Sequence, residues 1–84
     1  MNKEIIDDLL FKFPVLEIAL QAGTISIKMV REMLDVDRYY MQDLYKKLVM
    51  ARAVIGVSSS TFKGTPELLA YLKERAENVK TNGN

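Results

Sequence analysis

The sequence predicts a mostly α-helical domain with a small β-hairpin. Apolar residues recur at helical spacing in several segments, of which residues 38–52 are the longest. Two short stretches rich in β-branched or aromatic residues, 54–57 and 61–63, flank the run Ser58-Ser59-Ser60, which is a turn signal. With 84 residues and an apolar fraction of 49%, the chain is expected to form a single domain over residues 1–80.

The chain contains no cysteine and no histidine. Disulfides and thiolate zinc sites are therefore excluded, and the commonest general base and metal ligand is missing. The lack of disulfides favours a reducing, cytoplasmic setting. The chain contains no run of about 20 apolar residues, so no membrane span is expected. The adjacent acids Asp7 and Asp8 do not converge on one point of a helix. We therefore expect no catalytic site, no metal site and no cofactor.

Two helices are expected before the central segment. Apolar spacing predicts the first over residues 3–12, and Pro14 ends it because proline lacks a backbone N–H. Proline also suits the first position of a helix, so a second helix is expected over residues 15–22. Gly23 follows where helices often end in the left-handed conformation, and Thr24-Ile25 is β-like and able to form a short strand.

Residues 26–52 predict two helices joined by the turn Asp35-Val36-Asp37. Ser26 suits the N-cap of a helix over residues 27–34, and Asp37 suits the N-cap of a helix over residues 38–52. In the second helix the apolar side and the polar side are distinct. The apolar side holds Met41, Leu44, Leu48 and Ala51, and the opposite side holds Tyr39, Gln42, Asp43, Lys46 and Met50. Two helices joined by so short a turn form a helix-turn-helix, whose second helix can enter a DNA major groove.

The C-terminal segment predicts one more helix. Gly64 ends the hairpin pattern, and Thr65-Pro66-Glu67 supplies a capping hydroxyl, a proline at the first helical position and an acid near the positive helix end. This helix is expected over residues 66–78. The tail, residues 81–84, is expected to be disordered.

This order of elements resembles the winged helix-turn-helix superfamily, with extra N- and C-terminal helices. The residues that carry the resemblance are Ser26, Val30, Leu34, Val36, Asp37, Met41, Leu44, Leu48 and Val54-Ile55. The run from Gly23 to Ile27 also resembles the helix-two entry of the small γ domains of bacterial DNA translocases. The resemblance covers residues 14–63. It implies double-stranded DNA binding, with helix 38–52 in the major groove, hairpin 54–63 as the wing, and a role in transcription regulation or on chromosome, plasmid or phage DNA.

The sequence departs from that pattern at two positions. The superfamily often has glycine where helix three turns into the wing, whereas this chain has Arg52. A non-glycine residue in the left-handed conformation costs about 1 kcal/mol, so the helix is expected to end differently here. Asp43 lies in the expected reading face, where a carboxylate repels phosphates unless it accepts from a cytosine amino group.

The charge distribution favours the same central segment. Residues 1–22 carry a local charge of −2, residues 23–63 carry +3, and residues 64–84 balance, for a net charge of +1. The excess lies where a helix-turn-helix and its wing would meet phosphates. Ordinary solvated lysines would give the same count, and the near-neutral total favours the alternative that the domain binds protein.

The candidate DNA contacts lie on the two central helices and the wing. They are Lys28, Arg31, Arg38, Tyr39, Gln42, Lys46, Ser59 and Lys63. Glutamine can pair with adenine, and lysine can contact guanine or phosphate. A solvated helix face and an ordinary hairpin turn remain the alternatives. Tyr40 and Tyr45 are expected at the core edge, and Met29, Met33, Met41 and Met50 are expected to fill the core or an interface.

The terminal helices carry much apolar surface for so small a domain, which predicts a two-fold dimer. The expected interface is formed by Ile6, Leu10, Phe13, Leu69 and Leu72. The alternative is that both helices complete one monomer core. The competing function is a winged-helix adaptor or inhibitor that binds a protein partner and not DNA.

Overall fold

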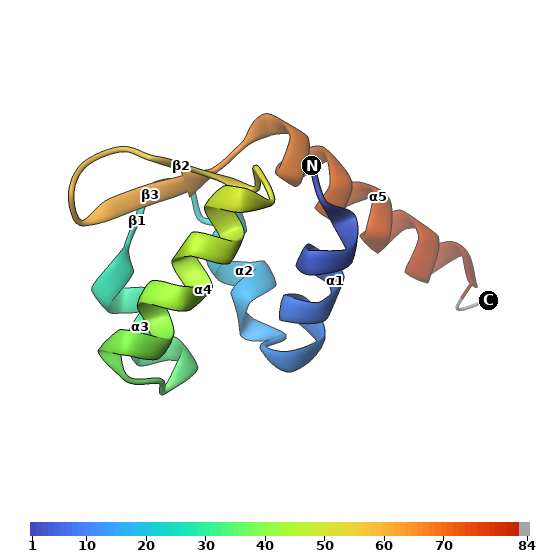
Figure 1. The fold of residues 1–84 in the computed structure, drawn as a ribbon. Helices are drawn as coiled ribbons and strands as arrows, with labels where there is room; N and C mark the ends of the chain where they lie inside the picture. Colours follow the sequence, from blue (N-terminus) through green and yellow to red (C-terminus); the bar gives the residue numbers. More distant parts are fainter. Residues whose placement is uncertain (83–84) are drawn as a thin grey trace.

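A computed structural model describes the backbone of residues 1–82 and the side chains of residues 1–78. Over this range the chain forms five helices and a small three-stranded sheet (Figure 1). The elements are α1 (Lys3–Lys12), α2 (Val15–Gln21), β1 (Ile25–Ser26), α3 (Ile27–Leu34), α4 (Arg38–Met50), β2 (Val54–Gly56), β3 (Thr61–Gly64) and α5 (Pro66–Asn82). The prediction of a mostly helical domain with a β-hairpin is confirmed.

The predicted N-caps of α3, α4 and α5 are confirmed. Ser26, Asp37 and Thr65 each accept a hydrogen bond from the backbone N–H three residues further on, at 2.9, 2.7 and 3.1 Å. Each such cap typically contributes about 1 kcal/mol. Asn2 caps α1 in the same way at 3.2 Å. The helix starts are therefore fixed by short-range hydrogen bonds that the sequence encodes directly.

The helix ends differ more from expectation. Gly23 adopts the predicted left-handed conformation, with φ 87°. Helix α4 ends at Met50, two residues early, because Arg52 takes φ 61° and turns the chain toward the sheet. Helix α5 continues to Asn82, so the expected disorder is wrong for residues 81–82. Residues 83–84 of that expected tail lie outside the described part of the chain.

The sheet has the strand order β1-β3-β2 and is antiparallel throughout. The predicted hairpin forms β2 and β3, and β1, just before α3, pairs with the other side of β3. Phe62 on the middle strand lies opposite Ile25 of β1 and Gly56 of β2. Its side chain is fully buried and meets the Tyr45 ring edge-on, at 5.4 Å between centroids. Tyr45 thus lies at the core edge as predicted.

The terminal helices complete the core. Ile6, Leu10 and Leu72 are 1, 5 and 1% exposed, and half-buried Phe13 meets the Tyr40 ring at 5.9 Å. Buried Ile6, Leu10 and Leu72 are therefore not available to the predicted dimer interface, as expected if both end helices complete one monomer core. Leu69, the fifth residue of the predicted interface, remains 41% exposed.

Polar contacts attach α5 to α1 and α2. The Tyr71 hydroxyl donates to the Asp7 carboxylate at 2.6 Å, and Arg75 lies 3.6 Å from Asp7 and 2.9 Å from Glu17. The hydrogen bond to Asp7, together with partial burial, raises the pKa of Tyr71 above its ordinary value of 10.0. Beyond these contacts α5 runs away from the rest of the domain (Figure 1).

Gly64 permits the end of β3 to approach α2, and Gly64→Ala is expected to lower the free energy of unfolding by about 1–3 kcal/mol. A Cβ at Gly64 would lie 3.0 Å from the Leu20 carbonyl oxygen and 3.2 Å from Leu68. Urea unfolding followed by circular dichroism measures the loss. The matched control is Gly56→Ala, whose Cβ would meet only the movable end of Tyr45, at 3.2 Å. Equal losses in the two variants would contradict the close approach.

The hydrogen bond from Tyr71 to Asp7 predicts a loss of stability at alkaline pH. The raised pKa means that the fold favours protonated Tyr71, so its contribution is complete below pH 10 and disappears as the pH rises through the folded-state value. Tyr71→Phe is expected to cost about 1 kcal/mol at pH 7 and to reduce the further loss of stability as the pH rises above the ordinary tyrosine pKa of about 10. The control is Tyr39→Phe, at a side chain that is 69% exposed. A stability–pH curve that Tyr71→Phe leaves unchanged would refute the assignment.

Candidate nucleic-acid interface

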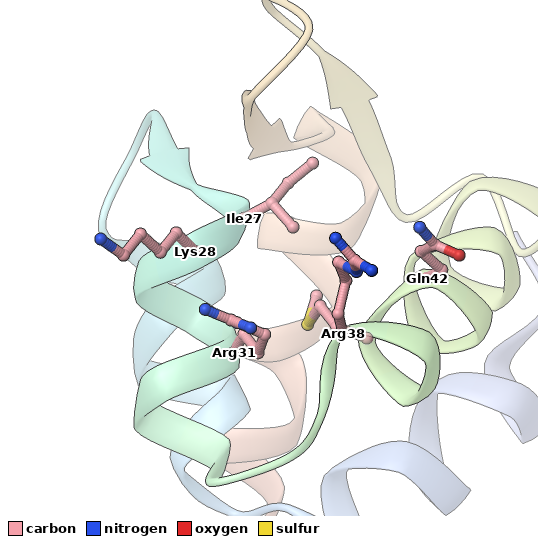
Figure 2. A pocket seen from close by; sticks show the side chains of 6 residues that line it. Ile27, Lys28, Arg31, Arg38 and Gln42 are labelled. Atoms are coloured by element: carbon pink, nitrogen blue, oxygen red, sulfur yellow. The ribbon is translucent and has the colours of Figure 1, made fainter.

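An open groove of about 460 Å³ separates the exposed sides of α3 and α4. It is lined by Ile27, Lys28, Arg31, Arg38, Met41 and Gln42. Figure 2 shows Lys28 and Arg31 on α3 and Arg38 and Gln42 on α4, with the Lys28 ammonium directed away from α4. The groove therefore combines apolar side chains with a cationic rim, and we call it the α3–α4 groove.

Helical spacing and the two caps place these residues. Ile27, Lys28 and Arg31 lie within one turn of the start of α3, and Arg38 is the first residue of α4. The connecting turn is tight because Asp35 adopts the left-handed conformation, with φ 54°. Aspartate tolerates this conformation better than most residues because its short polar side chain can bond locally. The turn brings the start of α4 back beside α3.

Two of the groove's cations have no acidic partner among the described residues. Lys28 lies 3.9 Å from Glu32 in an exposed pair, of a kind that contributes little. Arg31 makes no ion pair within the described chain, and Arg38 lies over the Tyr39 ring at 5.4 Å. Both guanidinium groups can therefore receive an anion.

The loop between β2 and β3 lies beside the groove. The Ile27 backbone N–H at the start of α3 donates to the Ser60 carbonyl at 2.9 Å. Within the loop, the Ser58 and Thr61 hydroxyls lie 2.7 Å apart, and the Ser60 N–H donates to the Ser58 hydroxyl at 3.3 Å. Ser59 is exposed at the centre of this loop. The loop is therefore bonded to the first residue of α3, which also lines the groove.

The structure brings together only part of the predicted site. Lys28, Arg31, Arg38 and Gln42 meet at the groove, with Ser59 in the adjoining loop. Tyr39 and Lys46 are exposed on the outward side of α4, two turns apart. Lys63 pairs with Ile55 and lies on the solvent face of the sheet, because its neighbour Phe62 points into the core. The eight predicted contacts thus divide into three adjoining groups.

Asp43 does not line the groove. A helix turns about 100° per residue, so Asp43 lies further around α4 than Gln42, on the side away from α3. It is one turn beyond Tyr40, whose ring contacts Phe13 near α1. Asp43 nevertheless lies only about 40° around the helix from Tyr39 and about 60° from Lys46, so it shares the exposed outward side of α4 with them.

Of the four methionines expected to fill the core or an interface, one lies in the core. Met41 is buried, with 1% of its surface exposed, and it also lines the groove. Met29, Met33 and Met50 are exposed, so they do not fill the core. Helical spacing gave no signal for Ile27 and Met41 as groove residues, since both belong to apolar stripes that also face the core.

The turn from α4 into β2 orients the hairpin. Arg52 takes the left-handed conformation that glycine often supplies in the winged-helix pattern, with φ 61°. The Thr65 hydroxyl lies 3.1 Å from the Arg52 carbonyl and 3.3 Å from that of Ala53. The Ala53 N–H donates to the Leu48 carbonyl at 2.9 Å. These bonds hold Arg52 in its strained conformation.

Within the described residues, no group of three or more acidic side chains is placed to hold a metal ion. The helices of that same part are too short or too polar to cross a membrane. No protein-family model, curated protein or solved structure matches the chain. Its function must therefore be inferred from its own residues and their geometry.

Relief of the strain at Arg52 is expected to stabilise the domain. Arg52→Gly should raise the free energy of unfolding by up to about 1 kcal/mol, since glycine adopts positive φ without a Cβ clash. Chemical denaturation measures the change. Arg52→Ala removes the same side chain and keeps the clash, so it serves as the matched control. An equal increase in the free energy of unfolding of both variants would show that the lost charge, and not the relief of strain, is the cause.

Proposed function

We propose that this chain is a winged helix-turn-helix protein that binds double-stranded DNA without catalysis, as a small cytoplasmic transcriptional regulator. The order α2, β1, α3, α4, β2, β3 follows the sequence of elements in that superfamily. In this arrangement α4 is the recognition helix and the loop 57–60 is the tip of the wing. Helices α1 and α5 are additions that complete the core.

The α3–α4 groove is the observation that carries the proposal. Arg31 and Arg38 lie there without acidic partners in the described chain, next to the loop that contains Ser59. A B-DNA major groove about 12 Å wide admits a helix. With the outward side of α4 inserted, Gln42 and Lys46 meet base edges. Lys28, Arg31 and the wing loop then meet the phosphates on either side.

The number of available cationic side chains sets the expected affinity for DNA. Lys28, Arg31, Arg38, Lys46 and Lys63 are the basic residues of the proposed surface. Each neutralised phosphate contributes about −0.9 to the slope of log affinity against log salt, and non-specific dissociation constants are typically about 10⁻⁴–10⁻⁶ M. A site with at most five such contacts therefore binds random duplex weakly and with a moderate salt dependence. Asp43 lies outside the groove but on the outward side of α4, where its carboxylate weakens phosphate binding unless it accepts from a cytosine amino group.

Removal of the two unpaired guanidinium groups is expected to weaken DNA binding. Arg31→Ala combined with Arg38→Ala should raise the dissociation constant for random duplex at least tenfold at about 50 mM salt and lower the salt slope by about 2. Fluorescence anisotropy with a labelled duplex, titrated at several salt concentrations, measures both quantities.

The matched control removes two other exposed lysines. Lys47 lies on the α1 side of α4 and Lys73 lies on α5, so Lys47→Ala with Lys73→Ala takes away the same charge outside the proposed surface. Its salt slope should equal that of the unmodified protein. Equal losses of DNA affinity in both double variants would show that only the net charge matters. No binding of the unmodified protein at about 100 μM in low salt would refute the DNA proposal.

A protein partner for α4 is the second candidate. Tyr39, Val49 and Met50 are 69, 45 and 78% exposed on the outward side of this helix. Apolar and aromatic side chains of this kind are enriched in protein interfaces. Binding through them would depend little on salt, whereas phosphate binding weakens steeply as salt rises. The salt series therefore separates the two candidates.

A further inference from the structure

We propose that the α3–α4 groove binds the acidic outer face of α1 from a second copy of this chain, in a head-to-tail contact. This inference goes beyond DNA binding and does not depend on it. The groove supplies positive charge around apolar side chains, and α1 presents an exposed aromatic side chain beside acids. The two surfaces are complementary and belong to different parts of the same molecule.

The groove requires an occupant with both apolar and anionic groups. Ile27 and Met41 give it apolar lining, while Arg31 and Arg38 supply charges without acidic partners among the described residues. It is open to solvent, whereas small-molecule sites usually enclose 70–90% or more of their ligand. A shallow groove of this kind suits side chains presented by a helix, in the manner of helix-in-groove recognition.

Helix α1 carries such a set of side chains. Glu4, Asp8 and Phe11 are spaced at i, i+4 and i+7, which places them on one stripe. All three are exposed, on the side opposite the buried Ile6 and Leu10. Phe11 is 87% exposed, more than any other large apolar side chain described. We call Glu4, Asp8 and Phe11 the α1 stripe.

The acids of the stripe are free to meet the groove's cations. Glu4 has no ion pair among the described residues, and Asp8 contacts only exposed Lys12, at 3.3 Å. Asp7 is excluded, since it binds Tyr71 and Arg75.

The contact must form between copies. Tyr40 of α4 contacts Phe13 on the α1 side, whereas Arg38 and Met41 face α3. Helix α4 lies between α3 and α1 in Figure 1, and the groove is on its α3 side. Each copy has one stripe and one groove in different places, so the contact is heterologous and leaves a free surface at each end. Such contacts produce rings or open chains.

The association is expected to be weak and sensitive to salt. Exposed ion pairs contribute little, and the interface is small, so a dissociation constant well above about 1 μM is expected. At 0.15 M salt, charges more than about 8 Å apart are largely screened. Sedimentation velocity at low salt and at protein concentrations up to about 0.5 mM suits this range.

Two variants that each lack one half of the contact provide the test. Arg38→Glu blocks the groove and keeps the stripe, while Phe11→Ser blocks the stripe and keeps the groove. Each variant alone should remain monomeric. A mixture should form a dimer that does not grow further, because only one complementary pair of surfaces is left. Both substitutions are at exposed positions, and circular dichroism verifies that each variant folds.

Nuclear magnetic resonance locates the contact within the mixture. Isotope-labelled Arg38→Glu protein mixed with unlabelled Phe11→Ser protein should shift the α1 signals and leave the α3 and α4 signals unchanged. The control is Ile18→Ser, which removes another exposed apolar side chain, 67% exposed on α2. It should associate like the unmodified protein.

Three outcomes would overturn the proposal. The first is an unmodified chain that stays monomeric up to about 1 mM at low salt. The second is self-association that survives in both single variants. The third is a chain that stays monomeric and whose groove residues show shifted resonance signals only when DNA or an unrelated acidic peptide is added. That result would assign the groove to those occupants. DNA binding by Phe11→Ser is measured separately, so either proposal can fail without the other.

Discussion

Burial of Phe62 on the middle strand determines how the rest of the domain is arranged. Phe62 lies opposite Ile25 on one side and Gly56 on the other, and its ring meets Tyr45 of α4. One side chain therefore connects the hairpin, the start of α3 and helix α4 to the same core. The backbone bond from Ile27 to Ser60 follows from this register. The groove and its adjoining loop are thus connected through the strand that carries Phe62.

The elements that short-range chemistry determines were predictable from the sequence. Ser26, Asp37 and Thr65 start their helices through hydrogen bonds to residues three positions away, and a capping residue identifies itself in the sequence. Gly23 likewise takes positive φ where the apolar pattern stops. The first turns of α3 and α4, which carry candidate contacts, are predictable for the same reason, because a cap fixes which residues begin a helix.

Features that depend on packing between elements were not predictable. Spacing shows that Ile6, Leu10 and Leu72 share an apolar side with their neighbours, but not whether that side meets the core or another molecule; all three are buried. The place of Asp43 depends on which flank of α4 faces α3, and helical periodicity leaves that rotation open. The groove is a property of two helices and their crossing, so no single segment of sequence contains it.

The net charge of +1 conceals a separation of charge that the fold creates. Of the acids near the groove, Asp37 caps α4, and Glu32 forms only an exposed pair with the groove residue Lys28. Arg31 and Arg38 are thereby left to an outside anion, while the α1 stripe displays acid on the far side of α4. Because salt screens charges beyond about 8 Å at 0.15 M, an incoming molecule responds to the nearest patch and not to the total. The two occupants proposed for the groove both require Arg38. DNA binding and head-to-tail association therefore exclude each other at any one groove, and protein concentration shifts the balance between them.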